Sequence, residues 1–105
     1  MPQECELSII IVNYNGLNDT CALIDSITFN EDMEVIVVDN GSKENEAGIL
    51  QEQHPNIKVI RSDKNLGFAG GNNLGIKASK GKYLYLINND TVFKKFNPNV
   101  LTKRL

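Results

Sequence analysis

The chain has 105 residues, of which 41% are hydrophobic and 23% are charged. This balance is typical of one small globular domain and excludes a disordered or collagen-like chain. The formal net charge of −2 and the scattered basic residues argue against a protein that binds nucleic acid phosphates.

Apolar runs and helical patterns alternate in the first half of the chain. A continuous β-branched run at 7–12 predicts a strand that is buried on both faces. Apolar residues at helical spacing predict a helix over 17–28, and a second buried strand is expected over 33–38. Ser42 is a suitable cap for the next helix, which should end before Pro55.

The same alternation continues in the second half. We expect a short strand over 57–60, a helix over about 69–79 and a fourth strand over 83–87. Pro98 suits the first position of a further helix, of which only the start would lie within the chain. The predicted order is therefore βαβαβαβ, followed by the beginning of a helix.

Strands separated by helices predict an α/β fold with an open, mostly parallel, Rossmann-like sheet and right-handed crossovers. The expected strand order is 3-2-1-4, so the first and fourth strands flank the point where the order reverses. In sheets of this kind, ligands bind outside the carboxyl ends of the strands near that point. The carboxyl rim is therefore the predicted site.

Polar residues follow three of the four predicted strands. They are Asn13, Tyr14 and Asn15 after the first strand, Asp39 to Ser42 after the second, and Asn88, Asn89 and Asp90 after the fourth. Each cluster alone is equally compatible with a simple turn. Three clusters on one rim favour a ligand site. Asp90 is the strongest metal candidate, because a hard cation on a diphosphate usually takes one or two carboxylates.

Glycines crowd the start of the third predicted helix, at Gly67, Gly70, Gly71 and Gly75. Glycine lowers helix propensity but lets a backbone or a ligand approach closely, and a helix N-terminus favours phosphate. For Gly75 we favour packing on the sheet, whereas for Gly70 and Gly71 packing and phosphate contact both stay open. The segment matches neither the dinucleotide-binding nor the P-loop pattern.

Four segments of the chain resemble family 2 glycosyltransferases of the GT-A fold, and within that family the rhamnosyltransferase-type branch. They are LSIIIVNYN at 7–15, VIVVDNGS at 35–42, NLGFAGGNN at 65–73 and LINND at 86–90. The resemblance covers about 7–93. It implies that 1–105 is the N-terminal, nucleotide-sugar-binding part of such a domain, truncated before the acceptor part.

The resemblance also implies roles for individual residues. It assigns nucleotide contacts to Asn13, Tyr14, Asn15, Asp39, Asn73 and Asn89. Asp39 matches an aspartate that accepts from the ring N–H of uracil or thymine, which implies a UDP- or dTDP-sugar donor. Asn88 and Asp90 occupy the family's D-x-D positions, so Asp90 would hold Mn²⁺ or Mg²⁺ on the diphosphate. Asn88 stands where the family has aspartate and is the weaker ligand.

By the same resemblance the reaction inverts the anomeric centre. A carboxylate base deprotonates the acceptor hydroxyl, which then attacks opposite the departing diphosphate. We expect that base beyond residue 105, so no catalytic residue is nominated within the chain, and these residues alone should lack transferase activity. The expected acceptor is a saccharide or a lipid-linked molecule, as in cell-wall or polysaccharide biosynthesis.

Two other functions stay open. A sugar-phosphate nucleotidyltransferase would need a glycine-rich, basic loop after the first strand, where this chain has Asn13 to Gly16. A flavodoxin-like or receiver-like binding module, without enzymatic activity, would need a phosphate loop or an acidic pair at the same place.

Cysteine usage and hydropathy bear on location. Cys5 and Cys21 match no zinc or redox spacing, so we expect unpaired thiols in a reducing compartment. Neither a signal peptide nor a membrane span is apparent, and we expect a cytoplasmic protein. Peripheral association of a longer parent protein with the inner face of a membrane stays open. Truncation would leave the fourth strand as an exposed edge through which the fragment could self-associate.

Overall fold

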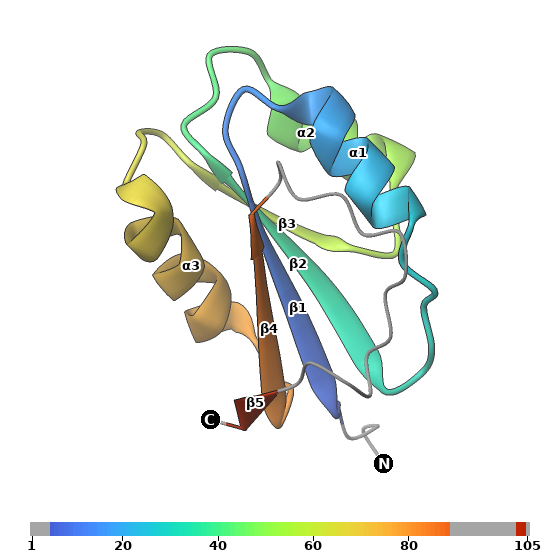
Figure 1. Cartoon of the computed structure of the whole chain (residues 1–105). Helices are drawn as coiled ribbons and strands as arrows, with labels where there is room; N and C mark the ends of the chain where they lie inside the picture. Colours follow the sequence, from blue (N-terminus) through green and yellow to red (C-terminus); the bar gives the residue numbers. More distant parts are fainter. Residues whose placement is uncertain (1–4, 89–102, 105) are drawn as a thin grey trace.

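The computed structural model describes residues 5–88 and 103–104, which form one sheet with helices on both faces (Figure 1). In chain order the elements are β1 (Leu7–Asn13), α1 (Leu17–Asp25), β2 (Met33–Asn40), α2 (Glu46–Gln53), β3 (Lys58–Ser62), α3 (Gly67–Ala78), β4 (Tyr83–Asn88) and β5 (Lys103–Arg104). None of the helices in these residues is long and apolar enough to cross a membrane.

The sheet has the order β3-β2-β1-β4-β5. The first four strands in this order pair in parallel, and β5 pairs antiparallel to β4. The predicted α/β fold with strand order 3-2-1-4 is therefore confirmed. Register places Asn13 of β1 beside Asp39 of β2, and Val12 of β1 beside Asn88 of β4. The polar strand ends thus meet at one rim.

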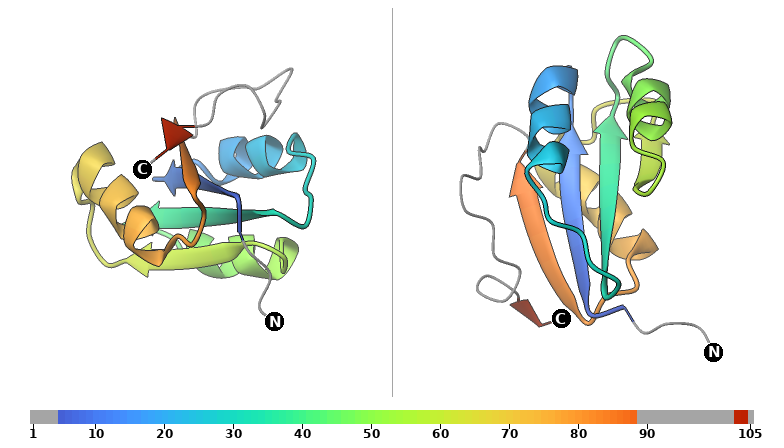
Figure 2. Two further views of the ribbon diagram at one scale, coloured as in Figure 1. Left: turned by 90° about the horizontal axis from the view of Figure 1, so that it is seen from below. Right: turned by 90° about the vertical axis from the view of Figure 1, so that its right-hand side faces the viewer.

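Helices lie on both faces of the sheet (Figure 2), and an apolar layer fills the space between the sheet and the helices on each face. Helices α1 and α2 cover one face, where alternate strand residues such as Ile9, Ile11 and Val37 are fully buried against Leu50. Helix α3 covers the other face, where Ile10 and its neighbours pack against the side chains of the helix. Burial on both faces explains why the parallel strands are continuous β-branched runs.

The glycines of α3 bring the helix close to the sheet. A Cβ on Gly75 would collide with Cγ2 of Ile10, and a Cβ on Gly71 would lie 3.0 Å from Cγ1 of Val12. Close packing, as expected for Gly75, is what the structure shows. Gly71 also packs, which resolves one of the two open positions. A Cβ on Gly70 would meet only the side chain of Leu66 in the preceding turn.

Two local expectations are wrong. Ser42 does not cap α2: the cap is Asn45, whose Oδ1 accepts from the backbone N–H of Gly48 over 3.1 Å. Ser42 is instead buried in the loop after β2, where its hydroxyl has other partners.

The second wrong expectation is the helix at the end of the chain. Lys103–Arg104 form strand β5 rather than part of a helix, because the outer edge of β4 offers backbone groups that need partners. The edge of β4 is accordingly paired at Tyr83 and Leu84, and is not left fully open as we expected. Pro98 lies outside the described residues.

Candidate functional site

The side chain of Asn13 lies at the centre of a buried polar network at the carboxyl ends of β1 and β2. Asn13 is fully buried, and its Nδ2 lies 3.2 Å from Oδ1 of Asp39 and 2.9 Å from Oε1 of Glu46. Its Oδ1 accepts from the hydroxyl of Thr20 over 2.6 Å. One amide therefore links β1 to β2, α1 and α2.

Ser42 joins this network to the loop that follows β1. Its hydroxyl donates to Oδ1 of Asp39 and accepts from the backbone N–H of Asn15 over 2.9 Å. In return, Oδ1 of Asn15 accepts from the backbone N–H of Lys43 over 2.9 Å. These two reciprocal bonds hold Asn15 at a φ of 50°, and they present Tyr14 with 45% of its surface exposed.

Asp39 has one oxygen in use and one without a partner. The residue is fully buried, and among the residues that the structure describes nothing donates to Oδ2. A buried acceptor without a hydrogen bond is destabilising. This oxygen is therefore suited to receive an N–H or O–H from outside the described chain.

The side chain of Asn40 points to the face of the sheet opposite to that of Asp39, where it holds the segment that leads into α3. Its Nδ2 donates to Oδ1 of Asn65 and to the carbonyl of Gly67, over 3.1 and 2.9 Å, and its Oδ1 accepts from the N–H of Leu66. Gly41, at a φ of +81°, allows the loop after β2 to lie close to the segment before α3, since a Cβ there would lie 2.5 Å from the backbone nitrogen of Asn65. Both polar atoms of the Asn40 side chain are thus hydrogen-bonded within the chain.

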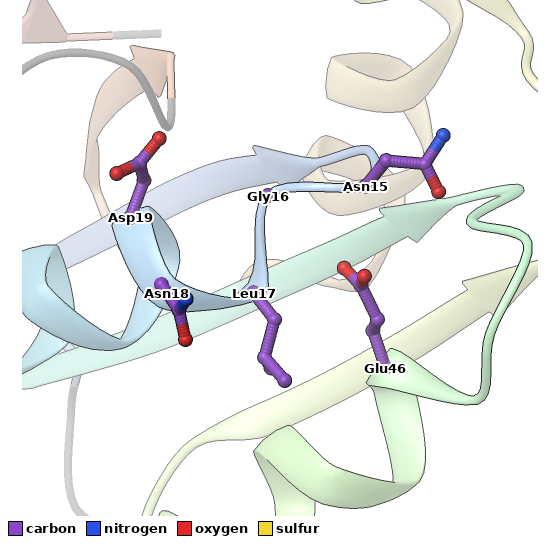
Figure 3. Close-up of a pocket in the computed structure, with 6 residues that line it drawn as sticks. All are labelled: Asn15, Gly16, Leu17, Asn18, Asp19 and Glu46. Carbon is purple, nitrogen blue, oxygen red and sulfur yellow. The ribbon is translucent and has the colours of Figure 1, made fainter.

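A pocket of about 360 Å³ opens between the first turns of α1 and α2. It is lined by Asn15, Gly16, Leu17, Asn18, Asp19 and Glu46, and Figure 3 shows Glu46 reaching from α2 toward the segment that carries Gly16. The first helical N–H groups of α1 lack a side-chain cap, so they are available to a ligand. Asp19 and Glu46 make the walls acidic.

The structure brings together four of the residues predicted to contact the nucleotide: Asn13, Tyr14, Asn15 and Asp39. Asn73 lies apart from them, exposed on α3. Asn88 ends β4 beside Val12, and its side chain is not described. Asn89 and Asp90 lie outside the described residues, so the predicted metal ligands stay predictions. The described part of the chain contains no cluster of three or more His, Cys, Asp or Glu that could hold a metal.

Sequence reasoning missed three residues of this region. Thr20 and Glu46 belong to helices and became part of the site only through contacts with Asn13. The resemblance indicates Asn73, but Asn72 is the buried member of the pair, with 4% of its surface exposed. A helical wheel that begins at Gly67 places Asn72 next to the sheet-facing glycines, and this was the available signal.

Comparison with known proteins identifies the family. The family model described as glycosyl transferase family 2 matches residues 8–102. The chain belongs to glycosyl transferase family 2.

Named relatives agree with this family. An uncharacterized glycosyltransferase of Haemophilus influenzae is 37% identical over 89 residues, which make up 83% of this chain and 30% of the relative. The dolichyl-phosphate beta-glucosyltransferase of Dictyostelium discoideum is 34% identical over 108 residues, covering 87% of this chain and 33% of the relative. This family 2 chain therefore spans about a third of the length of these relatives.

Solved structures share the fold. S. aureus TarS 1-349 in complex with UDP matches with a TM-score of 0.72 and 25% identity, over 81% of this chain and 27% of TarS. The mannosyltransferase PcManGT from Pyrobaculum calidifontis, in complex with GDP-Man and Mn²⁺, has a TM-score of 0.74 at 19% identity, over 86% of this chain and 29% of that one. The sheet described above is thus the GT-A type of sheet.

Proposed function

We propose that this chain forms the donor-binding part of an inverting family 2 glycosyltransferase that uses a UDP- or dTDP-sugar and a saccharide or lipid-linked acceptor. The observation that carries the choice of base is the buried, unpartnered Oδ2 of Asp39. Uracil and thymine offer a ring N–H to such an acceptor, whereas cytosine offers a lone pair there. Tyr14 supplies an exposed aromatic ring on the same rim, suited to stacking on a base.

Asp39 has no exposed surface, so a base can reach Oδ2 only when the rim loop shifts. That loop, at Tyr14 and Asn15, is exposed and is held by two hydrogen bonds of Asn15, one to the hydroxyl of Ser42 and one from the N–H of Lys43. Breaking these two hydrogen bonds costs little free energy, and ligand binding can supply it. In the complex, Asn13 and Ser42 would keep Oδ1 of Asp39 in place while Oδ2 receives the base.

The remaining assignments follow the resemblance to the family. Mn²⁺ or Mg²⁺ would neutralise the diphosphate as it leaves. Asp90 and, more weakly, Asn88 are the residues that would hold the ion, while Asn89 would add a further nucleotide contact. The general base would belong to residues beyond 105 of a longer protein, and these 105 residues alone would bind a donor without transferring it. We place that protein in the cytoplasm, at the membrane where the acceptor is lipid-linked.

The experiment is a calorimetric titration of the chain with UDP, dTDP and CDP, with and without Mn²⁺. We expect UDP and dTDP to bind more tightly than CDP. Asp39→Asn keeps the shape of the side chain but turns one oxygen into a donor, so it should reduce or reverse this preference. Asp63→Asn changes an exposed loop aspartate and serves as the matched control. Equal binding of UDP and CDP by the folded wild-type chain would contradict the assignment of Asp39, and no binding of any nucleotide would contradict the proposed function.

A further inference from the structure

Helix α3 carries two adjacent asparagines in opposite environments. Asn73 is exposed, whereas Asn72 has only 4% of its surface exposed and shares the sheet-facing side of the helix with Gly71 and Gly75. A buried amide needs hydrogen bonds on both its oxygen and its nitrogen. Asn72 and Asn73 are therefore a natural pair for comparing an inward with an outward side chain.

The carboxamide oxygen of Asn72 is buried and has no hydrogen-bond partner within 5–88 and 103–104. A leucine or alanine here would bury no polar atom and would favour the helix more than asparagine does. The chain thus keeps a side chain that its own described structure does not use. Unused buried polar groups of this kind are found where a ligand completes the hydrogen bonds.

The position of Asn72 relative to the sheet places it near the predicted ligand site. Its neighbour Gly71 packs on Val12, the residue before the last of β1, and on the amide of Asn40, the last residue of β2. Val12 lies beside Asn88 of β4 in the parallel register. This end of α3 is therefore level with the rim, over β1, next to the point where strand order reverses and ligands of such sheets bind.

We propose that Asn72 is a donor-binding residue, whose Oδ1 accepts a hydrogen bond from a hydroxyl of the nucleotide sugar, on the ribose or on the transferred sugar. The proposal rests on the proposed function, because it assumes that a nucleotide sugar occupies the rim. It assigns to Asn72 a role that the resemblance gave to Asn73. A hydroxyl fits because it brings a proton to the free oxygen and carries no charge into a site with 4% exposure.

A purely structural role for Asn72 makes the opposite prediction about stability. If the amide were bonded within the folded chain, removing it would lower the free energy of unfolding. If its oxygen awaits a ligand, replacing it with an apolar side chain of similar size should raise the midpoint of thermal unfolding and weaken donor binding. Stability and binding moving in opposite directions is the signature of a residue kept for function.

The test measures both quantities on the full chain for wild type, Asn72→Leu, Asn72→Ala and Asn73→Ala, using UDP and UDP-glucose as probes. We expect Asn72→Leu to raise the unfolding midpoint and both Asn72 variants to bind at least tenfold more weakly, while Asn73→Ala binds like wild type. A loss with UDP and UDP-glucose alike would identify a ribose hydroxyl, and a loss confined to UDP-glucose would identify the sugar.

Three results would overturn the proposal. One is wild-type affinity for both probes in the Asn72 variants, with Asp39→Asn still altering the choice between UDP and CDP; this would reject Asn72 and leave the proposed function intact. Another is a lower unfolding midpoint in both Asn72→Leu and Asn72→Ala, which would show a structural amide. Failure of the folded wild-type chain to bind either probe would reject the proposed function and this proposal together.

Discussion

Asn13 and Asp39 lie opposite each other in the register of β1 and β2, and the amide of Asn13 donates to the carboxylate of Asp39 over 3.2 Å, with both side chains fully buried. A neutral amide thus lies between two carboxylates, because Glu46 accepts from the same nitrogen. This arrangement ties the rim of the sheet to the first turn of α2.

Replacing Asn13 should destabilise the fold more than a surface asparagine does. Asn13→Ala would leave Thr20, Asp39 and Glu46 without a shared partner, and we expect a loss of about 2–3 kcal/mol in the free energy of unfolding. Urea denaturation measures this, with the exposed Asn18→Ala as control. Equal midpoints for the two variants would show that the network contributes nothing to stability.

Ser42→Ala should loosen the rim loop while leaving the core intact. The variant removes the acceptor of the Asn15 N–H, so hydrogen exchange of that amide should accelerate, and stability should fall by about 1 kcal/mol. Asn15→Ala removes the reciprocal bond instead and should expose the N–H of Lys43. Unchanged exchange at Asn15 in Ser42→Ala would mean that packing, not the hydroxyl, holds the loop.

Gly75→Ala should destabilise the chain although alanine is the better helix former. The gain in helix propensity is about 1 kcal/mol, but the new Cβ would collide with Ile10, and overpacking typically costs about 1–3 kcal/mol. Asn73→Ala makes an exposed change two residues away on the same helix and should be neutral or slightly stabilising. Thermal unfolding compares the two. A stabilised Gly75→Ala would show that α3 can move away from the sheet freely.

Cys21 should react slowly with alkylating reagents. Burial raises the pKa of its thiol, and the nearby carboxylates of Asp25 and Glu46 raise it further. Because the thiolate is the reactive form, a higher pKa leaves less of it at pH 8. Both cysteines are free thiols in the structure, so the measurement uses a Cys5→Ser variant and the rate of iodoacetamide modification against pH.

The rate at which iodoacetamide modifies Cys21 should reach half of its maximum at a higher pH in the folded chain than in the urea-unfolded chain. Asp25→Asn removes one of the negative charges and should move the profile part of the way back. A profile identical to that of the unfolded chain would contradict the raised pKa.

Much of the architecture could be predicted because it depends on local patterns. The runs at 7–12 and 33–38 are apolar on both faces, which only a parallel strand between two helical layers satisfies, and the helices between them require crossovers of one hand. The same logic put Asn13 and Asp39 at one rim, since the carboxyl ends of parallel strands lie on one side of a sheet.

The sequence by itself determined the alternation of strands and helices and the end of the sheet at which polar groups gather, because these follow from hydrophobic periodicity and from the parallel direction of strands joined by helices. Only the tertiary structure decided that Thr20, Ser42 and Glu46 meet Asn13, and that Asn72 rather than Asn73 faces the sheet. Hydrogen bonds between distant side chains depend on the register of strands and the rotation of helices. A single residue turns a helix by about 100°, so local sequence patterns do not resolve which neighbour is buried.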